Sequence, residues 1–131
     1  MEPDEETLAF AHRMFELARD GGTEHLAANV DAGLPVNLTN DKGDTLLILA
    51  AYHGHPETVA ALLARGADPG RVNDRGQTAL GAATFRRTRE SVVALLAVGA
   101  DPTAGGQSAL AVAQFFDLPE MAELLRGGRP A

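Results

Sequence analysis

Hydrophobic positions in this chain recur at two scales, with a helical spacing inside short segments and a longer period between segments. Residues 4–19 have apolar side chains three or four positions apart, which predicts a helix with one inward face made of Leu8, Ala11, Phe15 and Ala18. Two shorter stripes follow on either side of Gly54, namely Leu47, Ala50, Ala51 and Val59, Leu62, Leu63. We therefore expect short helices that pack in pairs.

Local signals define where one of these helix pairs begins and ends. Thr45 is a predicted N-cap, and Gly54 is expected to take the left-handed conformation that closes the first helix. Pro56 fits the first turn of the second helix, and Gly66 is expected to end it. Residues 40–43 and 73–76 are typical of tight turns.

The segment from Gly43 to Pro69 recurs 33 residues later, from Gly76 to Pro102. A truncated copy follows at residues 106–125, offset by 30 because the loop before it lacks three residues, and a divergent copy precedes residue 40. We expect a single domain over residues 1–126, with repeats at about 7–39, 40–72, 73–102 and 103–126, and a flexible tail at 127–131.

The 33-residue unit, with its Gly-x-Thr-x-Leu, Gly-His-x-Glu, Leu-Leu and Gly-Ala-Asp elements, resembles the ankyrin repeat over about residues 7–126. The resemblance implies an all-α solenoid of four stacked helix-turn-helix repeats joined by β-hairpin-like loops. One helix pair cannot bury its own apolar faces, so the four copies would support one another. The chain departs from the family at the Pro and His of the T-P-L-H signature, so the contact between Thr and His that the family implies is absent.

The third copy contains two residues that are unfavourable for this fold. Gly81 lies inside a predicted helix, and Arg87 stands where the second copy has Gly54 in a left-handed turn. Each costs about 1 kcal/mol relative to a better residue. We expect this copy to be the least stable internal one.

The composition excludes several classes of function. The chain has 131 residues, a net charge of −7 and no cysteine, so disulfides, thiolate metal sites and cysteine nucleophiles are excluded. It has no apolar run near the ~18 residues that a membrane span needs. The first residues lack the basic and apolar regions of a secretory signal, so we expect a cytoplasmic protein.

The resemblance implies that partners contact the concave face, at the loop tips and the exposed ends of the first helices. Carried over position by position, this predicts thirteen contact residues: Asp41, Lys42, Asp44, Tyr52, His53, Asp74, Arg75, Gln77, Phe85, Arg86, Gln107, Phe115 and Phe116. Tyr52, Phe85 and Phe115 are equivalent positions in successive copies. Their rings serve either as a binding surface or as packing between neighbouring copies, and Phe115 and Phe116 have the further alternative of covering the end of the stack.

The basic cluster of Arg86, Arg87 and Arg89 has two interpretations, a solvated turn or a site for an acidic patch on a protein partner. The net negative charge and the single lysine disfavour nucleic-acid binding. His53 and His55 lack a third ligand at a helical spacing, so we expect neither a metal nor any other cofactor.

No catalytic motif is present, and we expect that the protein is not an enzyme. The sequence favours a protein-interaction module that acts as an inhibitor, a shield or an adaptor. We expect a monomer. The alternative is a structural repeat protein that forms a homodimer through one end of the stack.

Overall fold

The computed structural model describes residues 4–127, and within this range it contains eight helices in four consecutive pairs. The expected all-α architecture of stacked helix pairs is confirmed. The first two pairs are α1 (Glu5–Asp20) with α2 (Thr23–Asp31), and α3 (Leu46–Tyr52) with α4 (Pro56–Ala64). The last two are α5 (Ala79–Arg86) with α6 (Arg89–Ala97), and α7 (Ala109–Phe115) with α8 (Pro119–Gly127).

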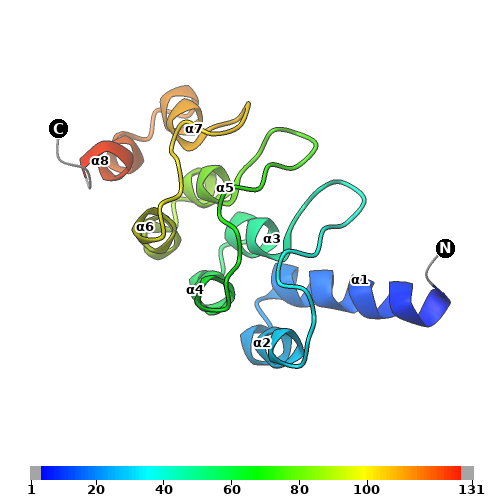
Figure 1. The fold of residues 1–131 in the computed structure, drawn as a ribbon. Helices are drawn as coiled ribbons and strands as arrows, with labels where there is room; N and C mark the ends of the chain where they lie inside the picture. The colour runs from blue at the N-terminus through cyan, green and yellow to red at the C-terminus, as the bar shows by residue number, and fades with distance from the viewer. Residues whose placement is uncertain (1–3, 128–131) are drawn as a thin grey trace.

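The helices form two rows (Figure 1). Helices α1, α3, α5 and α7 contact one another in sequence along one row, and α2, α4, α6 and α8 do the same along the other. The loops that connect successive pairs project past the first row (Figure 1). We call the surface bordered by the first row and these loops the inner face.

Side-chain caps fix the start of every helix in the first row. The hydroxyl of Thr45 accepts a hydrogen bond from the backbone N–H of Ile48 at 3.0 Å, which confirms the predicted cap. Asp4, Thr78 and Ser108 cap α1, α5 and α7 in the same way. A threonine or serine hydroxyl therefore caps the corresponding helix in three successive repeats.

The core lies between the two rows and between successive repeats. Residues 46–51, which make up all of α3 except Tyr52, are buried because α1 and α5 cover opposite sides of this helix. Alanines at equivalent positions, such as Ala50, Ala83 and Ala113, are at most 2% exposed. Such small side chains allow neighbouring short helices to pack closely, which explains the high alanine content.

A left-handed residue separates the two helices of every pair. Gly21 and Gly54 both have a φ of 77° there. The third and fourth pairs use non-glycine residues, Arg87 with a φ of 59° and Asp117 with a φ of 51°. The expected left-handed conformation is thus confirmed at Gly54, and Arg87 adopts it with a side chain that disfavours it.

The last loop packs against the third loop and against α5. The backbone N–H of Gln107 donates to the carbonyl of Gly76 at 2.9 Å, and the Gln107 carbonyl lies against Gly81 of α5. A Cβ atom at Gly81 would be 2.9 Å from that carbonyl oxygen. Gly81 lowers helix propensity, but a larger residue would not fit there, because the shortened loop occupies the space that a side chain would need.

Two further expectations need correction. Leu8 was expected to face inward but is 46% exposed, because α1 extends beyond the much shorter α3 that packs against it (Figure 1). The expected tail begins at residue 127, but Gly127 is the last residue of α8, and residues 128–131 lie outside the described range. Within residues 4–127 no helix is both long and apolar enough to cross a membrane.

We expect Arg87→Gly to raise the free energy of unfolding by about 1 kcal/mol, because glycine adopts the left-handed conformation without the Cβ penalty. Chemical denaturation measures this change. Arg86→Gly, the same substitution one residue earlier and inside α5, is the matched control and should lower stability. Equal effects of the two substitutions would contradict the expectation.

We expect Gly81→Ala to lower the free energy of unfolding by about 1 kcal/mol. Alanine gains about 1 kcal/mol of helix propensity, but overpacking against the Gln107 carbonyl costs roughly 1–3 kcal/mol. Gly106→Ala is the control, since a Cβ atom there has no neighbour within 4 Å. Stabilisation by Gly81→Ala would mean that the last loop moves away without cost.

Candidate functional site

Three aromatic rings from successive repeats touch one another on the inner face. The Tyr52 ring stacks on the Phe85 ring with a centroid distance of 6.0 Å, and the Phe85 ring meets the Phe116 ring edge-on at 5.2 Å. The three residues are 36%, 40% and 46% exposed respectively. We call them the aromatic row. The rings therefore pack between repeats, as one of the two alternatives states, and their exposed parts leave a binding role as a prediction.

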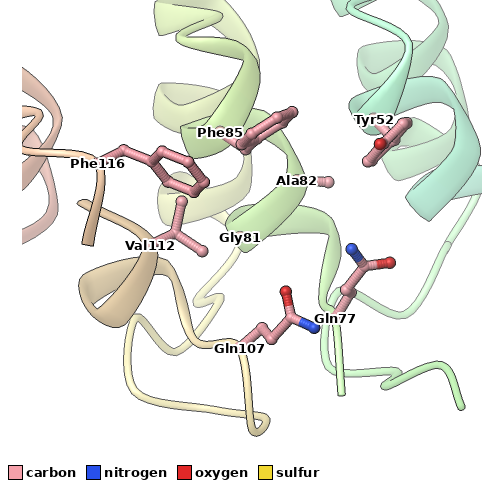
Figure 2. A pocket seen from close by; sticks show the side chains of 8 residues that line it. All are labelled: Tyr52, Gln77, Gly81, Ala82, Phe85, Gln107, Val112 and Phe116. Atoms are coloured by element: carbon pink, nitrogen blue, oxygen red, sulfur yellow. The ribbon is translucent and has the colours of Figure 1, made fainter. Parts of the chain in front are cut away.

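A hollow of about 220 Å³ lies beside the aromatic row (Figure 2). The rings border one side, and Gln77 and Gln107 at the bases of the last two loops border the other (Figure 2). Gly81, Ala82 and Val112 complete the lining. Because Gly81 has no side chain and Ala82 has only a methyl group, the surface is recessed at this point between the rings and the glutamines.

Phe115 has the same place in α7 as Tyr52 has in α3, the last residue of the helix, but its ring does not continue the aromatic row. Phe116, which directly follows α7, points back to Phe85, whereas Phe115 is 83% exposed and does not line the hollow. Tyr52 and Phe85 each pack on a ring of the following repeat. Phe115 belongs to the last repeat of the described range, so no following ring is available, and it contacts Phe116 at 4.9 Å.

The predicted loop residues divide into exposed tips and a buried base. Asp41, Lys42, Asp74 and Arg75 are exposed, as a contact role requires. Asp44 is 7% exposed, and its Oδ1 accepts a hydrogen bond from Nδ2 of Asn73 at 2.8 Å. Asp44 therefore joins the second loop to the third, and its predicted contact role does not fit this burial.

Asn73, which is not among the predicted contact residues, organises the third loop. Its Oδ1 accepts from the backbone N–H groups of Arg75 and Gln77 at 3.0 and 2.9 Å. Its Nδ2 donates to Asp44 and to Oε1 of Gln77, each at 2.8 Å. The signal that identifies it is the recurrence of Asn40 and Asn73 at equivalent turn positions, since Oδ1 of Asn40 accepts corresponding backbone bonds.

Positive charge surrounds one end of the aromatic row. The Tyr52 ring contacts the ring of His53, and burial together with the charges of Arg19, His55 and Arg86 holds the pKa of His53 below its ordinary value of 6.5. Asp20 acts in the opposite direction but more weakly. The neutral imidazole is therefore favoured in the folded protein.

Arg86, Arg87 and Arg89 are all exposed, in line with a solvated turn. Within residues 4–127 the ion pairs are Arg65 with Asp31 and Arg71 with Asp68, so none of the three arginines of the cluster takes part in one. Nη2 of Arg86 makes a long hydrogen bond of 3.4 Å to the carbonyl of His53. The guanidinium of Arg86 is thus held beside the row but has no carboxylate partner in the described chain.

His55 has a structural position instead. Its Nε2 donates to the backbone carbonyl of Arg19 at 2.6 Å, which joins the second repeat to the first. In the described part of the chain, no three His, Asp or Glu side chains gather where they could hold a metal ion. The inner face presents aromatic rings, side-chain amides and charged groups.

Comparisons with known proteins agree with the repeat pattern. A family model described as ankyrin repeats (3 copies) matches residues 14–105 and 47–129. A protein of Pseudomonas aeruginosa named as an ankyrin repeat protein is 53% identical over 57 residues. This alignment covers 44% of the present chain and 33% of that protein, so the chain matches about a third of its relative's length.

We expect His53→Gln to reduce the loss of stability at acidic pH. A depressed pKa means that the unfolded chain binds a proton at His53 before the folded protein does, so stability falls as the pH drops below 6.5. The measurement is the difference in unfolding free energy between pH 7.5 and pH 5. His25→Gln, which removes an exposed imidazole from α2, is the control. An equal effect of both substitutions would rule out the environment of His53 as the cause.

Proposed function

Because the chain belongs to the ankyrin-repeat family, whose members are generally protein-interaction modules, we propose that its inner face binds a protein partner. In this proposal the protein acts as an inhibitor, a shield or an adaptor for that partner. Its action is noncovalent binding, with no catalytic step and no cofactor. We propose a cytoplasmic monomer that binds neither nucleic acid nor a membrane, in keeping with the absence of cysteine and the net charge of −7.

The observation that carries the proposal is the continuous aromatic row beside the hollow. Large aromatic side chains bring much contact area with few rotatable bonds, and they are enriched among the residues that dominate binding energy. Here each ring is already held by a ring of another repeat, at centroid distances of 5.2 to 6.0 Å. A partner would therefore immobilise little that is not already ordered, which favours affinity.

The charges beside the row indicate the character of the partner surface. Arg86, which lies next to Phe85, lacks a carboxylate partner in the described chain. Arg75 and Lys42 add exposed positive charge at the loop tips, where Asp41 and Asp74 are also present. The partner surface in this proposal combines an apolar group with an acidic group, and the acidic group lies on the Arg86 side.

A second candidate function rests on Phe115. A phenylalanine that is 83% exposed at the end of the described stack could bind the same end of another copy and form a homodimer. Light scattering at micromolar concentration separates the two candidates. A dimer that Phe115→Ala converts to a monomer supports self-association, whereas a wild-type monomer supports binding of another protein.

We expect Phe85→Ala to weaken partner binding at least tenfold, because this ring is the centre of the row and contacts both of the others. The first measurement is affinity purification from the native cells with wild type and variant as bait. The second is titration of the purified partner that only wild type retains.

Controls must separate binding from folding. Phe85→Ala also removes two ring contacts, worth about 1 kcal/mol each, so its stability is measured beside that of Phe85→Leu, which keeps apolar contact but not a flat ring. Val98→Ala removes a side chain that is 50% exposed just after α6, away from the row. Retention of the same proteins by wild type and folded Phe85→Ala would contradict the proposal.

A further inference from the structure

The two glutamines that line the hollow are each held by one end of the side-chain amide. Oε1 of Gln77 accepts from Nδ2 of Asn73 at 2.8 Å, and Nε2 of Gln107 donates to the backbone carbonyl of Arg75 at 3.0 Å. These bonds fix which amide atom is which. Because Oδ1 of Asn73 already accepts two backbone N–H groups, the Asn73 atom that faces Gln77 is its nitrogen, so the Gln77 atom it contacts is the oxygen. The backbone carbonyl of Arg75 can only accept, so the Gln107 atom it contacts is the nitrogen.

The other end of each amide has no hydrogen-bond partner among the described residues. Nε2 of Gln77 and Oε1 of Gln107 both point from the loop bases toward the hollow and the rings (Figure 2). The hollow therefore presents one hydrogen-bond donor and one acceptor from adjacent loops, opposite an apolar wall. The parallel bridge between Gln77 and Gln107 sets the backbones of the two residues side by side.

A donor beside an acceptor matches the main chain of an extended peptide. In an extended segment the N–H and C=O groups of one residue point to the same side, which is the pairing that β-strands use. A helix has already used these groups in its own hydrogen bonds, so it could not satisfy both glutamines.

The charge of Arg86, at the end of α5 that lies away from Gln77, places a second requirement on the peptide. Gln77 precedes the N-terminus of α5, and Arg86 is the last residue of that helix. An eight-residue helix is about 12 Å long, which an extended chain spans in three to four residues. Arg86 has no ion-pair partner in the described range, and the surroundings of His53 at this end are positive on balance.

On the basis of the protein-binding function above, we propose that the hollow binds an extended peptide segment of the partner. The C=O and N–H groups of one peptide residue pair with Nε2 of Gln77 and Oε1 of Gln107. An apolar side chain of the segment lies against the aromatic row. An acidic side chain three or four residues along the segment from this apolar residue pairs with Arg86.

The test uses an acetylated, amidated peptide, Gly-Phe-Thr-Thr-Glu-Gly, and its reversed sequence, because the chain direction is open. Either peptide is titrated into the ¹⁵N-labelled protein, and the side-chain amide signals of Gln77 and Gln107 are followed by NMR. We expect both signals to shift with one common dissociation constant. Replacing the peptide Glu by Lys, or N-methylating the main-chain nitrogens, should weaken binding at least tenfold.

Matched variants assign the contacts. Gln77→Glu keeps the acceptor for Asn73 but replaces the free donor by an oxygen, and Gln107→Leu removes the free acceptor. Each should weaken binding of the peptide at least tenfold, whereas Gln114→Glu and Gln114→Leu, at an exposed glutamine outside the hollow, should not. Arg86→Ala should abolish the preference for Glu over Lys.

The proposal is overturned if neither peptide shifts the glutamine signals at 5 mM, or if the Gln77 and Gln107 variants bind as wild type does. This outcome differs from failure of the proposed function. A partner lost with Phe85→Ala but retained by both glutamine variants would support protein binding and reject the extended segment, in favour of a helical or folded surface. If the peptide binds and shifts both glutamine signals but no protein is captured, the peptide site is supported and the proposed binding of a protein partner is not.

Discussion

A pair of helices with only seven to nine residues each, such as α3 and α4, is too small to cover both of its own apolar faces. In this protein α3 is covered by α1 on one side and by α5 on the other, so that residues 46–51 are buried without exception. The last repeat lacks such a neighbour on one side within the described chain. Leu110 accordingly stays partly exposed, whereas its equivalents Leu47 and Leu80 are at most 1% exposed. Stability is thus a property of contacts between repeats more than of any one repeat.

The same dependence on neighbours generates the candidate site. The last connecting loop is three residues shorter than the others, and its backbone pairs with the third loop at Gly76. This contact sets the Gln107 carbonyl against Gly81, where the second repeat has the buried side chain of Ile48 instead. The glycine needed for the close approach also leaves the surface recessed below the rings. The contact between the last two loops places Gln107 beside Gln77, and Gly81 and Ala82 of α5 form the floor of the hollow.

Features that repeat along the chain were predictable from the sequence, and features that depend on a difference between repeats were not. The helix pairs, the cap at Thr45 and the left-handed backbone at Arg87 follow from local signals that recur at a fixed period. The burial of Asp44 depends instead on Asn73, 29 residues away in the next loop. The contact of Phe116, rather than Phe115, with the Phe85 ring likewise joins two repeats. Neither fact has a signal within one repeat.

The aromatic row contributes to stability and is also the surface proposed for recognition, which limits how its residues can change. A ring that contacts its neighbours at 5.2 and 6.0 Å contributes to the cohesion of successive repeats, and the same ring is 40% exposed to solvent. A substitution at Phe85 therefore alters both properties, whereas substitutions at the loop tips alter only the surface. Because Asp41, Lys42, Asp74 and Arg75 are exposed and do not form the core, their charges are free to vary with the partner. In the proposed binding mode, the row would supply the bulk of the contact energy and the loop tips would supply discrimination between partners.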